Sequence, residues 1–385
     1  MDISLNEDQM MIKEMASKFA ASELAPMAAK LDEVGDRDAF LANLKKMAEL
    51  GFMGLNVEGA FGGVEAGTVA FSIAVTEIAR ACAATAVTMS VTNMVAEVIQ
   101  CIASEQQKSY YLPKICSGEY SAAAFCLTET TAGSDPANMK TTAVLEDGQW
   151  VLNGAKQFIT SAEYAGVMVV WALTDSHAPK GKGISCFLVE QNTPGMSISK
   201  AEHKMGQKAS VTNEVLFDQC RIAEHALMGE LNGGFKIAVA ELAGGRIGIG
   251  SLALGIGLAA MDYARDYIAQ RQQFGQTLSK FQGLQWMMGD AYTNLEAARL
   301  LLMSAADTKE KGLPFAKAAS MAKLFSSEKA NEACYSALQM LGGYGYIKEY
   351  PLERYARDVR ITSIYEGTSE IQRVIIAREL LKELN

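Results

Sequence analysis

One carboxylate near the end of the chain, Glu366, lies in a segment whose residue types could do chemistry: Ile364-Tyr-Glu-Gly-Thr-Ser-Glu-Ile-Gln372. Ser369 and Gln372 have the spacing of a capping box, so a helix is expected to begin here. A helix N-terminus favours a carboxylate through its dipole, which explains Glu366 without any catalysis. In an apolar, substrate-filled pocket, desolvation would instead raise the pKa of Glu366 and make it a candidate general base.

A second segment, residues 125–134, is dense in hydroxyl groups and small residues: Phe-Cys-Leu-Thr-Glu-Thr-Thr-Ala-Gly-Ser. Such a loop can bring backbone N–H groups and hydroxyls against a flat polar ligand, such as a flavin ring. Clusters of Ser, Thr and Gly are usually ordinary turns, however. The loop alone therefore does not decide between a ligand site and a turn.

Two glycine-rich segments resemble nucleotide motifs only on paper. Gly248-Ile-Gly-Ser-Leu-Ala253 matches the dinucleotide fingerprint, but it lies inside an apolar helical stretch with no strand before it. We expect its glycines to let helices approach closely. Gly342-Gly-Tyr-Gly345 is not followed by the Gly-Lys-Ser/Thr of a phosphate loop. The usual sequence signatures for NAD and ATP are thus missing.

The composition excludes several classes of protein. Of 385 residues, 49% are hydrophobic and 21% charged, which is ordinary globular usage rather than that of a disordered chain. The net charge of −9 disfavours binding to nucleic acid. Seven cysteines without a CxxC pair and three dispersed histidines indicate neither a disulfide framework nor a metal site. We expect free thiols in a reducing compartment and a cytoplasmic location.

No export signal or membrane span is expected. The first residues are acidic, whereas a secretory or transit signal would be basic. The longest uncharged, mostly apolar stretch, residues 247–261, has 15 residues and is shorter than the roughly 20 that a bilayer requires. A buried helix is the better interpretation.

The chain divides by texture into three parts. Helical periodicity predicts an all-α domain over residues 1–119, and a charged helix from Ser104 is expected near its end. Short β-branched runs separated by turn signals predict a β domain over 120–225, and long helical segments predict a bundle over 226–385. The turn signals are Asp147-Gly148, Asn153-Gly154, Lys180–Gly183 and Thr193–Gly195. The order is typical of an α+β fold, not of βαβ alternation.

Further motifs raise the odds that the first two segments bind ligands. They are Lys156-Gln-Phe-Ile-Thr160, Arg271-Gln-Gln-Phe-Gly275 and Gln339-Met-Leu-Gly-Gly343. With these and the Tyr-Glu-Gly-Thr-Ser-Glu string, the whole chain resembles the acyl-CoA dehydrogenase family. Gly244-Gly-Arg-Ile-Gly-Ile249 looks most like its short-chain, butyryl-CoA-type members.

The resemblance implies both a fold and a reaction. The implied fold has an N-terminal helical domain, a middle antiparallel β-barrel-like domain and a C-terminal four-helix bundle, as a homotetramer with one FAD per subunit. The implied reaction is α,β-dehydrogenation of an acyl-CoA thioester to the trans-2-enoyl-CoA, with electrons passing to an electron-transfer flavoprotein.

The resemblance also assigns residues. Glu366 matches the base that takes the α-proton. Positions that match substrate contacts are Ser134, Arg246, Tyr365 and Gly367. Positions that match FAD contacts are Phe125, Leu127, Thr128, Gly133, Ser134, Phe158, Ile159, Thr160, Arg271, Phe274, Gln282, Gln339, Gly342, Gly343, Thr368, Ser369 and Glu370, some of them reaching across a subunit contact.

Two positions near the family's arginine bear on the reaction, and the second of them keeps alternatives open. Some members carry the base directly before the family's arginine, where this chain has Gly245, so Glu366 is the only candidate. The acid usually three residues before that arginine is Ala243 here. Because that acid helps to hold the CoA arm, an oxygen-using oxidase or an enzyme for carrier-protein-bound acyl groups remains an alternative. A non-enzymatic flavin-binding scaffold is a third hypothesis.

Overall fold

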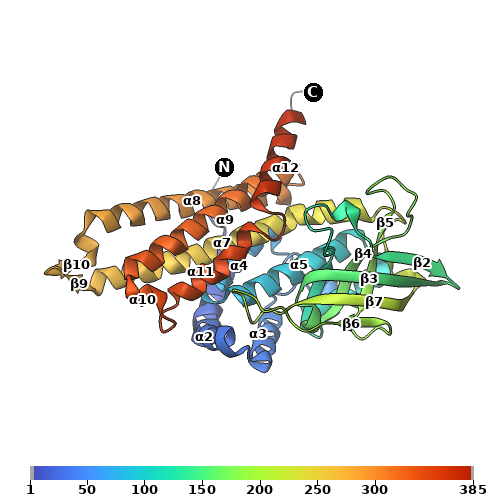
Figure 1. Cartoon of the computed structure of the whole chain (residues 1–385), viewed down its shortest axis with the longest axis horizontal. Coiled ribbons are helices and arrows are strands. Elements are labelled where there is room, and N and C mark those ends of the chain that lie inside the picture. Colours follow the sequence, from blue (N-terminus) through green and yellow to red (C-terminus); the bar gives the residue numbers. More distant parts are fainter. Residues whose placement is uncertain (1–3, 383–385) are drawn as a thin grey trace.

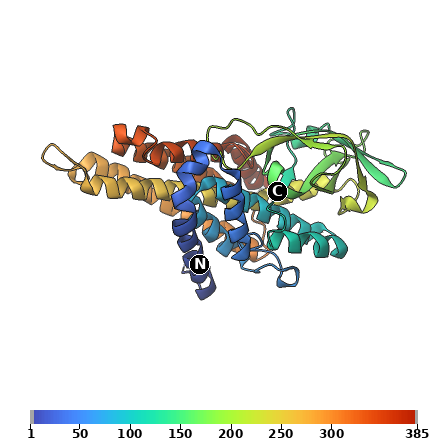
Figure 2. The ribbon, with the colours of Figure 1, turned by 90° about the horizontal axis from the view of Figure 1, so that it is seen from below.

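The computed structural model describes residues 4–382 (Figure 1). Along the chain, helices come both before and after a sheet domain. The sheet forms one end of the elongated molecule and the long C-terminal helices form the other. Figure 2 shows the N-terminal helices crossing the middle of the molecule, between these two parts. Helix, sheet and helix therefore follow one another in the order that the sequence predicts.

Six helices make up the N-terminal part. They are α1 (Glu7–Phe19), α2 (Ala25–Val34), α3 (Arg37–Glu49), α4 (Gly67–Ala81), α5 (Ala83–Ile102) and α6 (Glu105–Cys116), with a π-helical turn at Ala20–Leu24. The apolar run that includes α4 and α5 is broken at Cys82, whose backbone is extended (φ −147°). Helix α6 has the expected start, because Ser104 and Gln107 form a reciprocal capping box.

Eight strands form one sheet between residues 122 and 228. They are β1 (Ala122–Cys126), β2 (Thr142–Glu146), β3 (Gln149–Thr160), β4 (Ala165–Leu173), β5 (Ile184–Glu190), β6 (Met196–Ile198), β7 (Thr212–Ala223) and β8 (Leu227–Met228). The hydrogen-bonded order is β6-β7-β3-β2-β4-β5-β8, and β1 pairs with β4. Most pairings are antiparallel, as predicted, but β4 pairs in parallel with both β1 and β2.

Of two predicted turns between residues 147 and 154, the first is confirmed and the second is wrong. Asp147-Gly148 joins β2 to β3 with positive φ at both residues, as a two-residue hairpin requires. Asn153-Gly154 is not a turn but lies inside β3, where the register with β7 shifts. Gly154 has φ +143°, and a Cβ there would lie 2.7 Å from the Thr141 Cα. The glycine therefore marks a close approach of two backbones within a bulged strand.

Three long helices dominate the C-terminal part. The elements are α7 (Gly234–Gln270), β9 (Gln272–Gln273), β10 (Gln276–Thr277), α8 (Gln282–Glu310), α9 (Ala316–Leu341), α10 (Gly343–Tyr346), α11 (Leu352–Arg360) and α12 (Ser369–Lys382). Helices α7, α8 and α9 pack side by side, whereas α12 stands out from the body of the molecule (Figure 1). The predicted domain boundaries after residues 119 and 225 stay predictions; α6 ends at Cys116 and α7 begins at Gly234.

The glycines of the apparent dinucleotide fingerprint lie in the interior of α7, where they pack helices together. A Cβ at Gly248 would lie 2.3 Å from the Ser90 Oγ, and one at Gly250 would lie 2.7 Å from a Leu302 methyl carbon. By length and composition, α5 and α7 are apolar enough to cross a bilayer, but 78% of the most apolar window of each is buried within the described residues. This is the profile of core helices.

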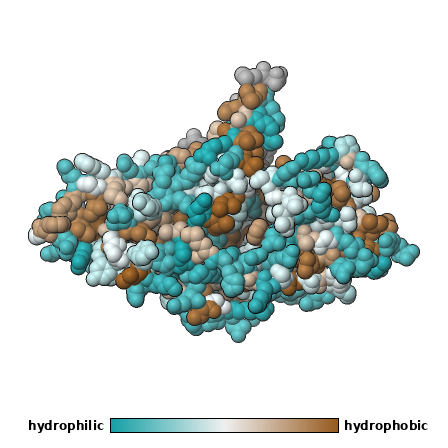
Figure 3. Space-filling model, in the orientation of Figure 1, coloured by the Kyte–Doolittle hydropathy of each residue, from teal (hydrophilic) through white to brown (hydrophobic). Residues whose placement is uncertain are grey.

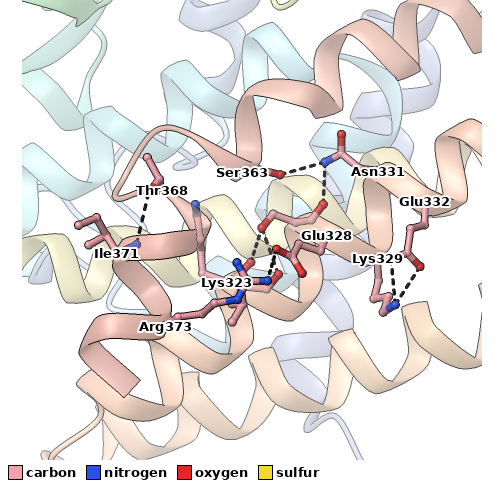
Figure 4. Close-up of polar contacts among 11 residues, drawn as sticks. Lys323, Glu328, Lys329, Asn331, Glu332, Ser363, Thr368, Ile371 and Arg373 are labelled. Carbon is pink, nitrogen blue, oxygen red and sulfur yellow. Dashed lines mark hydrogen bonds and ion pairs between the residues drawn. The ribbon is translucent and has the colours of Figure 1, made fainter. Parts of the chain in front are cut away.

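The expected capping box of the last helix is absent. Helix α12 begins at Ser369, and Thr368 is the capping residue, because its Oγ1 accepts from the Ile371 N–H at 3.3 Å (Figure 4). The Ser369 Oγ is buried without a partner among the described residues. The Gln372 amide is used differently, since it donates to the backbone before the helix.

Candidate active site

The backbone of Glu366 is strained. Its φ is +55° and that of the following Gly367 is +86°. A non-glycine residue in this region costs of the order of 1–3 kcal/mol and persists only where the surroundings impose it. The Oε2 atom of Glu366 is buried and has no hydrogen-bond partner among residues 4–382. A strained loop thus presents an unpaired carboxyl oxygen inside the protein.

Two side chains from other parts of the fold hold this loop. The Lys323 Nζ on α9 donates to the Gly367 carbonyl at 2.8 Å, and Figure 4 shows Lys323 reaching toward the loop that carries Thr368. The Gln372 amide donates to the carbonyls of both Glu366 and Gly367, at 3.1 and 2.9 Å. Both carbonyls are therefore satisfied, and no partner within residues 4–382 is found for the Glu366 N–H. It is a free donor beside a free carboxyl oxygen.

Burial and two cations set the charge state of the site. Burial raises the pKa of Glu366 to about 7, while the positive charges of Arg246 and Lys323 oppose that rise. Burial also lowers the pKa of Lys323 to about 8. Arg246 is buried, and its Nε has no partner among the described residues. Buried polar groups are normally paired, so this arrangement is typical of a site completed by a polar ligand.

The face of α7 opposite Glu366 has no side chain. A Cβ at Gly245 would lie 2.9 Å from the Glu366 Oε2 and 2.7 Å from the Met94 sulfur. The glycine therefore lets the carboxyl group lie directly against the backbone of α7. It also means that no second carboxylate faces Glu366 from this position on α7.

The hydroxyl-rich loop is joined to the strained end of β3. The Gln157 N–H donates to the Thr128 carbonyl at 2.8 Å. Phe158 has φ +59° and is 63% exposed, although it lies at a register shift within a strand. An aromatic ring held outward in a strained conformation is well suited to stacking on a flat ligand.

A buried ion pair fixes the same loop. The Lys156 Nζ donates to Glu129 at 2.8 Å, and both side chains are almost completely buried. Glu129 also accepts from the backbone N–H groups of Lys140 and Thr141, and Lys156 donates to the Leu127 carbonyl. The pair therefore connects the loop, β3 and the segment before β2, which gives the loop one defined shape.

Helix α5 brings these parts together. The Thr88 hydroxyl is 3.2 Å from that of Ser161, directly after the predicted flavin contact Thr160. Thr92 accepts from the Ala123 N–H of β1, at 3.2 Å. Met94 faces the Glu366 carboxyl across Gly245. The end of β3 that carries the predicted flavin contacts, strand β1 and the Glu366 carboxyl group therefore all lie near α5.

The other predicted flavin contacts lie elsewhere in the chain. They are exposed, and they lie where α7 and α9 end and α8 begins: Arg271, Phe274, Gln282, Gln339, Gly342 and Gly343. A pocket of about 460 Å³ is lined by four of them, Arg271, Gln339, Gly342 and Gly343. Helix α7 runs about 35 Å from Gly248, near α5, to Arg271, at a rise of about 1.5 Å per residue. A single chain therefore does not bring these residues, called the Arg271 group below, together with the predicted flavin contacts around Phe158.

The residues in both groups fit a dinucleotide cofactor. Gly342 and Gly343 have nothing within 4 Å of a built Cβ, and Gly342 has φ +59°, so the backbone is open to a ligand. Phe274 has φ +55° and is 92% exposed, which is unusual for an aromatic side chain in one isolated chain. Arg271 supplies a guanidinium that suits a diphosphate.

The remaining predicted site residues lie in the Glu366 loop, at the start of the helix after it and in the hydroxyl-rich loop. The Tyr365 hydroxyl accepts from the Gln207 amide at 3.2 Å, which ties the loop to the segment before β7. Gly133, Ser134 and Glu370 are exposed, and Leu127 is buried. Sequence reasoning missed Lys323, Gln372, Lys156 and Glu129, whose roles depend on contacts between distant elements. Lys156, Glu129 and Gln372 lay within motifs that had been singled out, whereas Lys323 did not.

Three family models together match nearly the whole chain. The model described as acyl-CoA dehydrogenase, N-terminal domain, matches residues 6–119; the middle-domain model matches 124–220, and the C-terminal-domain model matches 232–381. The chain is 45% identical over 386 residues to the acryloyl-CoA reductase (NADH) of Anaerotignum propionicum, covering 99% of this chain and 96% of that protein. It is 41% identical over 385 residues to the short-chain specific acyl-CoA dehydrogenase of Clostridium acetobutylicum, covering 99% and 100%.

A solved structure has nearly the same fold. It comes from the work "Electron transferring flavoprotein of Acidaminococcus fermentans: Towards a mechanism of flavin-based electron bifurcation". Its chain is 42% identical, the TM-score is 0.97, and the match covers 99% of this chain and all of that one.

Proposed function

The chain belongs to the acyl-CoA dehydrogenase family, and from this premise we propose that it dehydrogenates a short-chain acyl-CoA thioester to the trans-2-enoyl thioester. The observation that carries the proposal is the unpaired Glu366 Oε2, buried opposite the bare Gly245 face of α7. Its pKa of about 7 suits a group that must accept a proton near neutral pH.

FAD is the cofactor of this family and supplies the hydride acceptor when it is bound. The protein's own part is to remove the α-proton, and Glu366 takes it. The free Glu366 N–H is placed to donate to the thioester oxygen, which lowers the pKa of the α-carbon by stabilising negative charge on that oxygen. Arg246 and Lys323 keep Glu366 from becoming too weak an acid to be ionised at pH 7.

We also propose that FAD is bound between subunits of a homotetramer. The distance between the two groups of flavin contacts supports this, because the Arg271 group of one subunit would complete the Phe158 site of another. The end of the molecule that carries the Arg271 group exposes large apolar side chains, among them Trp286, Tyr335 and Tyr346. Figure 3 shows apolar surface at this end and on the projecting helix α12, where Val374 and Leu381 are exposed. Such surface is typical of an interface.

An electron-transfer flavoprotein is the proposed electron acceptor. It is supported by the structural relative with a TM-score of 0.97, which comes from work on such a flavoprotein. The seven cysteines are free thiols, which supports the proposed cytoplasmic location.

Reduction of a short enoyl-CoA is a second candidate, favoured by the 45% identity to an acryloyl-CoA reductase. In that direction Glu366 would give its proton to the α-carbon, and so would act in its protonated form. With a pKa of about 7, reduction should be fastest below neutral pH and dehydrogenation above it. Measuring both directions across pH 6–9 tests the part that Glu366 plays in each.

Anaerobic mixing with butyryl-CoA tests the proposal. We expect the yellow flavin to bleach with butyryl-CoA faster than with longer acyl-CoA thioesters, and the product to be the enoyl thioester. Absence of bleaching with every acyl-CoA, by an enzyme that retains FAD, would overturn it. Rapid reoxidation of the bleached enzyme in air would favour the oxidase alternative, and a marked preference for butyryl-acyl carrier protein would favour the carrier-protein alternative.

A further inference from the structure

The bare face of α7 continues beyond Gly245 to a group of charged side chains. A Cβ at Gly244 would lie 2.9 Å from the Lys309 Nζ and 3.8 Å from the Glu241 Oε1. Glu241 is one helical turn before Gly245, about 6 Å away along the axis. The group consists of Glu241, Lys309 and Glu97, from α7, α8 and α5.

Glu241 is the unpaired member of this group. Lys309 pairs with Glu97 at 2.5 Å. The Glu241 Oε1 has no hydrogen-bond partner among the described residues, and only 9% of the residue is exposed. Burial, with the negative charge of Glu97 adding to it, raises the pKa of Glu241 well above its ordinary value. A buried carboxyl group that keeps its proton can both donate and accept a hydrogen bond, as an amide ligand requires.

The two directions along α7 from Glu366 differ in burial and polarity. Toward Gly248 the helix meets Ser90 and Phe71, which are buried at 3% and 6% exposure, so this end is closed and mostly apolar. Toward Glu241 the neighbours are charged, and Glu97 and Lys309 are partly exposed. Whatever carries the thioester must therefore leave past the charged end.

We propose that Glu241, supported by Lys309 and Glu97, binds the first amide of the pantetheine arm that carries the substrate. This inference rests on the proposed function and deepens it. That amide is two methylene groups from the thioester sulfur, which matches the one-turn separation of Glu241 from the Gly245 face. CoA and acyl carrier proteins share this arm.

Two thioesters that differ only at the amide test the proposal. S-butyryl-N-acetylcysteamine keeps the first amide, and S-pentyl thiobutyrate replaces it with methylene groups at equal length. We expect the wild-type enzyme to have a kcat/KM about tenfold higher for the amide thioester, a typical value for a buried hydrogen bond. Glu241→Leu should abolish that preference and raise KM for butyryl-CoA with kcat within about twofold, whereas Glu241→Gln should retain most of it.

Controls separate this inference from the proposed function. Asp266→Asn removes an exposed carboxyl from the same helix and should leave the amide preference intact. Butyryl-CoA and butyryl-acyl carrier protein should lose affinity alike in Glu241→Leu if Glu241 reads only the shared arm; a loss with one of them alone would identify that carrier as the source of the arm. An unchanged preference in Glu241→Leu, or an equal loss with both small thioesters, would overturn the inference. Failure of the wild-type enzyme to act on any thioester would overturn the proposed function instead.

Discussion

Replacing Lys323 by methionine should move the pH dependence of the reaction without removing the base. Lys323 is buried, contacts the Glu366 loop at the Gly367 carbonyl over 2.8 Å, and lowers the pKa of Glu366 against the effect of burial. A nearby opposite charge typically lowers a carboxyl pKa by about 1–3 units. Taking the lower limit, the loss of the cation raises the pKa of Glu366 from about 7 to roughly 8.

The sign follows from the role of Glu366 as a base. Only its ionised form accepts the α-proton, so kcat/KM rises with pH through its pKa. At pH 7 the ionised fraction would fall from about one half to about one tenth, which predicts a loss of about fivefold that is recovered by pH 9. The assay is kcat/KM for butyryl-CoA from pH 6 to 9. Lys323→Arg, which keeps the charge, should leave the midpoint in place. If Lys323→Met lowered the rate equally at every pH, the electrostatic argument would be refuted.

Three other substitutions test separate parts of the site. Gly245→Ala should change the unfolding free energy by less than about 1 kcal/mol, because better helix propensity offsets the crowding, yet lower kcat by displacing Glu366; a fully active variant would contradict the need for a bare face. Glu129→Gln should cost about 3–5 kcal/mol in urea unfolding, because Lys156 is left as a buried unpaired charge; a loss below 1 kcal/mol would show the pair to be dispensable. Arg271→Gln should lower the FAD retained after gel filtration without changing the thermal stability of the apoprotein, and unchanged retention would argue against the subunit-contact site.

Much of the fold could be predicted from local pattern. The helix–sheet–helix order follows from periodicity, and the Asp147-Gly148 hairpin follows from the positive φ that such a turn needs. The break at Cys82 could not be predicted, because no glycine or proline marks it and packing decides it. Asn153-Gly154 gave the wrong result because the same dipeptide serves a turn and a bulge, and the approach of Thr141 is a tertiary contact.

The site was only partly accessible from the sequence. The motif around Glu366 singled out the carboxyl group, but its unpaired oxygen and strained φ are properties of the folded loop. Lys323 is 44 residues before Gly367, and no local pattern connects them. Nothing in the sequence distinguishes Glu241 from an acid on the surface of a helix, and its burial results from tertiary packing. The distance from Arg271 to the Phe158 site likewise depends on the direction of α7, not on sequence separation.

The central claim is that the Glu366 carboxyl removes the α-proton, and rapid anaerobic mixing of Glu366→Gln with butyryl-CoA tests it most directly. Glutamine keeps the size and the backbone of the loop but cannot accept the proton. We predict a yellow protein that still binds the thioester and whose flavin bleaches at least about a hundredfold more slowly than in the wild-type enzyme. Bleaching at the wild-type rate would contradict the account.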